Sequence, residues 1–107
     1  MYNHERNILK SITSKLRERF SERIQGVYAF GSRVRGDHNA WSDFDVLIVV
    51  KDRNPALENE IMDIFVEEEL KSGVIFSPVI KDFTAYEKEK NLNTPFYENI
   101  QREGVVF

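Results

Sequence analysis

The feature that most constrains the fold is the apolar run Val46-Leu47-Ile48-Val49-Val50, the longest in the chain. Side chains alternate between the two faces of a strand. A strand that is apolar on both faces needs a cover on both sides, as in the central strand of an α/β sheet. The run therefore predicts an α/β fold in which a small mixed sheet packs with helices.

Two aspartates, Asp43 and Asp45, open this strand, with Phe44 between them. Alternation along the strand places both carboxylates on one face, with Cβ atoms roughly 7 Å apart. Carboxylates on one face repel each other unless something neutralises them. A hard divalent cation with oxygen ligands, Mg²⁺ or Mn²⁺, would do so. We therefore expect a metal site at this pair.

A turn with two glycines, residues 31–36 (Gly-Ser-Arg-Val-Arg-Gly), precedes the aspartates and follows a strand predicted over residues 24–30. Glycine lets the backbone turn and approach a ligand closely. The first N–H groups of a short helix beginning at Ser32 would attract an anion such as phosphate. If the two strands are antiparallel neighbours, the end of the first lies beside the start of the second. The turn and the aspartates would then meet.

Helical periodicity predicts two long helices, over residues 3–22 with Asn3 as N-cap and over residues 55–71 after Asn54. Shorter helices are expected from Asp82 or Thr84 and from Thr94, and strands over residues 74–80 and 105–107. The charged face of the first helix is assigned to solvent, with a partner surface as the alternative. Its members are Glu5, Lys10, Lys15, Arg17, Glu18 and Arg19. The acidic end of the second helix, residues 67–69, is also assigned to solvent, with a contact to a basic partner as the alternative.

Length and composition limit the classes of protein to consider. At 107 residues, the chain is expected to form one domain over residues 1–107. A formal net charge of −3 argues against nucleic acid as a direct ligand, and the absence of cysteine excludes disulfides and Cys-based zinc sites. No signal peptide or membrane span is expected, which favours the cytoplasm.

The spacing of the two motifs points to a family. Gly31-Ser32, ten intervening residues and Asp43-Phe44-Asp45 resemble the signature of the DNA polymerase β-type nucleotidyltransferase superfamily. Over nearly its full length the chain resembles the smallest members, the minimal nucleotidyltransferase (MNT) proteins. These proteins are often encoded beside a helical HEPN protein and act as its antitoxin.

The resemblance implies a role for each residue of the motifs. Asp43 and Asp45 would be the catalytic, metal-binding residues, and Gly31 with Ser32 would hold the β- and γ-phosphates of ATP. Arginines would also contact the nucleotide or the acceptor, because a guanidinium group can form paired hydrogen bonds with phosphate. The candidates are Arg33 and Arg35, and either could instead pair with Asp37 or Asp43 as a structural clamp. In the loop, His38 is expected to be exposed, with contact to a nucleotide or a metal as the alternative. Trp41 is expected to pack beneath the loop, with stacking on a base as the alternative.

The third predicted strand departs from the family pattern. Active members carry an aspartate there, and Ser77 stands at about that position in this chain. A neutral serine is a poor metal ligand or base. Pro78 suggests a sheet edge or a bulge, and Asp82 could reach back only if the chain bends.

Two functions from different classes follow. The first is a Mg²⁺-dependent enzyme that transfers AMP from ATP to a HEPN toxin and so neutralises it. The alternative is a weak or inactive binding module that neutralises its partner by complex formation alone. A small-molecule nucleotidyltransferase ranks third because no second domain for the acceptor is visible. A homo-oligomer is left open.

Overall fold

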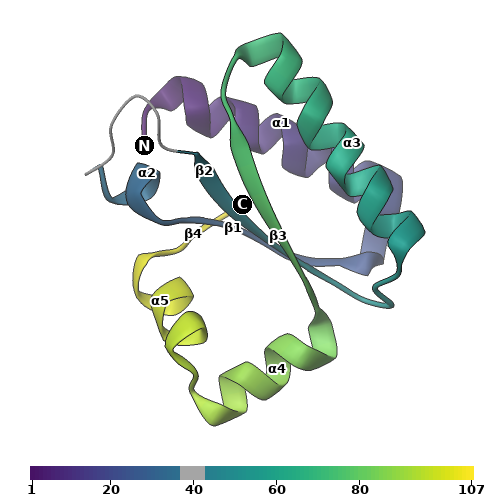
Figure 1. The fold of residues 1–107 in the computed structure, drawn as a ribbon, viewed down its shortest axis with the longest axis vertical. Helices are drawn as coiled ribbons and strands as arrows, with labels where there is room; N and C mark the ends of the chain where they lie inside the picture. Colours follow the sequence, from purple (N-terminus) through teal and green to yellow (C-terminus); the bar gives the residue numbers. More distant parts are fainter. Residues whose placement is uncertain (37–42) are drawn as a thin grey trace.

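A mixed sheet in the order β3-β2-β1-β4 organises the chain in the computed structural model, which describes residues 1–36 and 43–107 (Figure 1). The strands are β1 (Ile24–Phe30), β2 (Phe44–Val50), β3 (Phe76–Asp82) and β4 (Val105–Val106). The helices are α1 (Asn3–Phe20), α2 (Ser32–Arg35), α3 (Pro55–Ser72), α4 (Phe83–Leu92) and α5 (Pro95–Glu103), with a short 3₁₀ turn η1 (Ser21–Arg23) after α1. The predicted α/β class and mixed sheet are confirmed.

The strand pairings place the predicted motifs at one end of the sheet. β1 and β2 are antiparallel, as predicted, and Phe30 lies opposite Asp45. β2 and β3 are parallel, with Ser77 opposite Asp45. β3 lies at the edge of the described sheet, in agreement with the edge position that Pro78 predicted.

The central strand β2 packs on both faces. Phe44, Val46, Ile48 and Val50 join the core beneath α1 and α3, and Leu47 and Val49 join a smaller core beneath α4 and α5. Figure 1 shows α1 and α3 running side by side and α4 and α5 gathered away from them. Because Asp45 alternates with Val46, it belongs to the face of α4 and α5.

Side-chain caps fix the helix starts. Asn54 accepts a hydrogen bond from Leu57 N at 2.9 Å, which confirms the predicted cap of α3. Of the two starts proposed for α4, Asp82 is the one that caps, accepting from Thr84 N at 2.9 Å. The prediction of Asn3 as the cap of α1 is wrong, because Tyr2 occupies that place and its backbone N–H donates to Glu5 Oε1 at 3.1 Å.

The acidic end of α3 is only partly in solvent, contrary to the prediction. Glu68 is buried because the Lys15 ammonium of α1 donates to its carboxylate. Glu69 accepts a hydrogen bond from Phe76 N at 2.8 Å. Of the three acids, Glu67 alone is exposed as predicted. In residues 1–36 and 43–107, no helix combines the length and hydropathy that a membrane span requires.

Candidate functional site

The glycine turn lies directly against a carboxylate. Gly31 follows Phe30, the register partner of Asp45. Gly31 has φ +84°, and a Cβ on it would overlap Asp45 Oδ2. Backbone conformation and lack of space both require glycine here. The predicted meeting of turn and carboxylate is therefore confirmed as geometry.

The turn itself is a single helical turn closed by a second glycine. The N–H groups of Val34 and Arg35 both donate to the Gly31 carbonyl at 3.1 Å. Gly36 adopts φ +81° and closes α2 by donating to the Ser32 carbonyl at 3.0 Å. A helix offers no internal partner to its first N–H groups. The turn can therefore present backbone donors beside Asp45.

The two aspartates interact electrostatically. Burial raises the pKa of Asp45, the charge of Asp43 raises it further, and Arg35 opposes both effects. Asp43 is exposed, whereas Asp45 is half-buried at the sheet. A cation beside the pair would favour the ionised form of both groups. The local field therefore suits the binding of a metal.

Arg33 forms an ion pair that the sequence did not predict. Its guanidinium donates to the carboxylate of Glu5 in α1, and the two side chains are 15% and 5% exposed. The Arg33 Cζ also lies 5.5 Å from the centre of the Phe44 ring. Of the two roles left open for Arg33, a structural pair is present, though with Glu5. Its contact with a nucleotide stays a prediction.

The assignment of Glu5 to the solvated face of α1 is wrong, since this residue is only 4% exposed. Its spacing contained a signal, because Glu5 stands three and four residues before the buried Ile8 and Leu9. Residues at such spacings share one face of a helix. The charge of Glu5 led to its assignment to the solvated face, whereas the helical periodicity indicates the buried face.

Arg35 connects the turn to the end of α5. Its Nη1 lies 3.1 Å from Glu103 Oε2, and the side chains are 44% and 26% exposed. No sequence pattern marked Glu103 as a neighbour of the turn. The other partner proposed for the arginines, Asp37, lies outside the described residues, as do His38 and Trp41.

The third strand places a serine at the level of Asp45. Ser77 lies opposite Asp45 in the parallel pair, so the two belong to one face of neighbouring strands about 4.8 Å apart. Asp82 pairs with Val50 at the far end of the sheet, roughly 17 Å along the strand from Ser77. It caps α4 there and does not reach back.

The donor set at the turn suits one hard cation better than two. Within residues 1–36 and 43–107, no cluster of three acidic, histidine or cysteine side chains could hold a metal. Mg²⁺ is usually held by one or two carboxylates together with the phosphates of a substrate. Asp43 and Asp45 fit that pattern.

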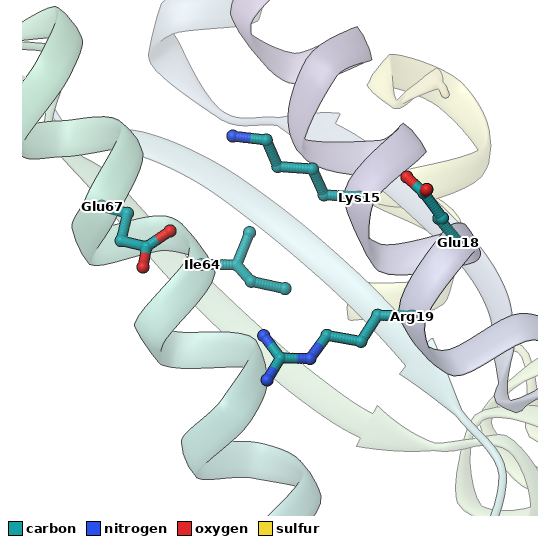
Figure 2. A pocket seen from close by; sticks show the side chains of 5 residues that line it. All are labelled: Lys15, Glu18, Arg19, Ile64 and Glu67. Atoms are coloured by element: carbon teal, nitrogen blue, oxygen red, sulfur yellow. The ribbon is translucent and has the colours of Figure 1, made fainter.

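A groove elsewhere on the molecule has a different character. Figure 2 shows its lining, which consists of Lys15, Glu18 and Arg19 of α1 and Ile64 and Glu67 of α3. The groove has a volume of ≈ 350 Å³. These helices cover the face of the sheet opposite Asp45, and the lining mixes charges of both signs. Nothing in this groove matches the acidic pair and glycine turn of the candidate site.

Comparison with known proteins agrees with this geometry. Residues 9–106 match the model of the nucleotidyltransferase domain family. A putative protein adenylyltransferase of Methanocaldococcus jannaschii is 28% identical over 103 residues, which cover 96% of this chain and 97% of the relative. A second putative protein adenylyltransferase of that organism is 30% identical over 99 residues, with 92% and 93% covered.

Solved structures share the fold. A putative nucleotidyltransferase from Sulfolobus solfataricus superposes with a TM-score of 0.55 at 26% identity, over 94% of this chain and 77% of the other. A toxin-antitoxin structure with AMP-PNP also gives a TM-score of 0.55, at 14% identity over 90% and 69% of the two chains, and shows likeness of fold alone. With the family model spanning almost the whole sequence, the chain belongs to the nucleotidyltransferase domain family.

Proposed function

We propose that this protein transfers AMP from ATP to a partner protein, that the partner is a HEPN toxin, and that the transfer neutralises it in the cytoplasm. The observation that carries the enzymatic part is the contact between the glycine turn and Asp45, which brings the backbone that we propose to bind phosphate to a carboxylate that we propose to bind metal. The relatives named as protein adenylyltransferases support a protein acceptor. The HEPN partner follows from the resemblance to the MNT proteins.

The proposed roles follow the geometry of the turn. Ser32 and the adjoining backbone N–H groups hold the β- and γ-phosphates, and Arg35 stands beside them as a further cation. Asp43 and Asp45 hold Mg²⁺, which when bound neutralises the triphosphate. The acceptor oxygen bonds to the α-phosphorus and its proton leaves to solvent. The bond from that phosphorus to the bridging oxygen breaks, and pyrophosphate departs.

A specific observation favours the binding module as a second candidate. Ser77 takes the register position beside Asp45 where a third carboxylate would complete a two-metal site. A single metal leaves one of the two reacting oxygens without direct charge stabilisation. The chain would then bind its partner without modifying it.

One experiment separates the two candidates. The chain is purified with the protein encoded beside it and incubated with ATP and Mg²⁺, and both proteins are weighed by mass spectrometry. The double variant Asp43→Ala with Asp45→Ala removes the proposed metal ligands. The matched control, Glu18→Ala with Glu22→Ala, removes two exposed acids that lie outside the acidic pair.

Transfer predicts a gain of one AMP on the partner, lost in the site variant and kept in the control. A stable complex with unchanged masses, equally stable in the site variant, would reject transfer in favour of the binding module. The absence of both mass change and complex would reject the proposed partner.

A further inference from the structure

Helix α3 carries a line of exposed apolar side chains on its outer face. Met62, Val66 and Leu70 are 38%, 47% and 83% exposed. Residues four apart lie one above the other on a helix, so these three form a continuous ridge, here called the α3 ridge. The opposite side of the helix is buried, through Leu57, Ile61, Ile64 and Phe65. Contiguous exposed apolar surface rimmed by polar residues marks protein-binding sites.

Negative charge borders the α3 ridge. Asp63 and Glu67 follow Met62 and Val66 directly in sequence and are exposed, as is Lys71, which follows Leu70. Helix α3 holds six acidic residues and one lysine. Glu58, Glu60 and Glu68 pair with cations of this chain. Within the part of the chain that the structure describes, Asp63 and Glu67 form no ion pair, and the charge of Glu67 also acts on Lys15 across the groove between α1 and α3.

This charge decides between the possible occupants of the ridge. Helix α3 as a whole is acidic, so two copies pairing through it would bring two helices of like net charge together, which opposes a dimer on this face. An anionic lipid surface would be repelled for the same reason. A ridge of residues four apart packs into the groove between the corresponding rows of another helix. The apolar line and its acidic border therefore match a helix that is apolar on one side and basic at its rim.

We propose that the α3 ridge is a docking surface for a basic amphipathic helix of a protein partner. The inference rests on the proposed function in that it supplies a partner to dock. The surface belongs to the face of α1 and α3, whereas Asp45 belongs to the face of α4 and α5. Docking at the ridge therefore leaves the acidic pair open, and the two activities can be measured separately.

The test uses a synthetic peptide of about eighteen residues, roughly the length of α3, with leucine along one helical side and lysine at the rim. It is titrated into the ¹⁵N-labelled full chain, and amide shifts are followed by NMR. The first variant, Val66→Ser with Leu70→Ser, removes apolar area. The second, Asp63→Lys with Glu67→Lys, reverses the border charge. The matched controls are Leu92→Ser, at a leucine of α4 that is 77% exposed, and Glu18→Lys with Glu22→Lys.

The expected result is a set of shifts centred on α3 and a loss of affinity of about tenfold or more in both ridge variants, which is about 1.4 kcal/mol. The effect of charge reversal should shrink at high salt. Shifts centred elsewhere, or affinities that the ridge variants leave equal to the controls, would overturn the proposal. Sedimentation of the chain alone adds a second check, because a dimer that Leu70→Ser dissolves would assign the ridge to a second copy.

Failure here is distinguishable from failure of the proposed function. Affinity for Mn²⁺ and ATP is measured on the same variants and should be unchanged in them. Loss of peptide binding with intact nucleotide binding would concern the ridge alone. Circular dichroism of each variant verifies that the fold is retained.

Discussion

Asp45 fills the space that Gly31 leaves free: a Cβ on Gly31 would overlap Oδ2 of the Asp45 side chain. The antiparallel register of β1 and β2 creates this contact, because it sets the residue after Phe30 beside the second residue of β2. The glycine turn and Asp45 are therefore one structural unit. A side chain at position 31 must displace the carboxylate.

Gly31→Ala should destabilise the protein and weaken Mn²⁺ binding together. With φ +84° and ψ −165°, Gly31 has a backbone conformation that is essentially restricted to glycine and costs about 1–3 kcal/mol for a residue with a Cβ, and the overlap with Asp45 adds to it. Gly36→Ala is the control in the same turn, since Gly36 has φ +81° and a Cβ added to it would meet nothing within 4 Å. It should lose stability by strain alone and keep its Mn²⁺ affinity. Calorimetric unfolding and Mn²⁺ titration check both, and equal behaviour of the two variants would contradict the argument.

Asp45→Asn should raise the Tm of the metal-free protein at neutral pH. Burial and the Asp43 charge raise the pKa of Asp45 above its usual 3.8, so the folded state holds this proton more firmly than the unfolded chain does. Ionisation of Asp45 therefore lowers stability as the pH rises through that value, and the amide removes this effect. Below pH 3.8 the difference should vanish, because both states are then protonated.

Metal binding should reverse the order of the Tm values of the wild type and Asp45→Asn. Mn²⁺ should raise the Tm of the wild type by binding the folded state, with little effect on Asp45→Asn. Asp63→Asn, at an exposed acid of α3, is the control and should respond to Mn²⁺ as the wild type does. A Tm for Asp45→Asn at or below the wild-type value in the absence of metal would refute the repulsion argument.

Short sequence patterns predicted the sheet and the turn. They did not predict the ion pairs between residues that are far apart in the sequence. The two-sided apolar run identified β2, and the hairpin-like order of β1 and β2 brought Gly31 to Asp45. The pair of Glu5 with Arg33 joins residues 28 positions apart, and that of Lys15 with Glu68 joins residues 53 apart. Such pairs depend on the angle at which helices dock, which no short pattern contains.

Glu5→Ala should destabilise the protein more than the loss of an exposed ion pair does, because it removes a carboxylate partner from the largely buried Arg33 guanidinium. It should also weaken binding of ATP, since Arg33 belongs to the turn. Glu5→Leu combined with Arg33→Met replaces both charges by apolar groups and should recover most of the stability. The exposed pair of Arg53 and Glu58 is the control, where Glu58→Ala should cost about 1 kcal/mol or less.

ATP affinity of the double variant then reveals what the pair does. Affinity that stays low in a stable double variant would show that the ion pair positions the turn or that Arg33 contacts phosphate. Charge-swapped Glu5→Arg with Arg33→Glu separates these, since a positioning pair is restored and a phosphate contact is not. Recovery of full ATP affinity with Leu and Met would contradict both roles.

Ser77→Asp should strengthen metal binding and speed nucleotide transfer. Ser77 lies opposite Asp45 in the parallel pair of β2 and β3, on a neighbouring strand about 4.8 Å away, so the new carboxylate would join the acidic pair. A third carboxylate allows a second metal to stabilise the departing oxygen. Ser77→Asn has the same shape without the charge and is the control. Without metal, the Tm of Ser77→Asp should be lower than that of Ser77→Asn, because the new carboxylate repels the acidic pair. Mn²⁺ should reverse the order of the two Tm values. Transfer by Ser77→Asp no faster than by Ser77→Asn would show that a missing carboxylate at this position does not limit the reaction.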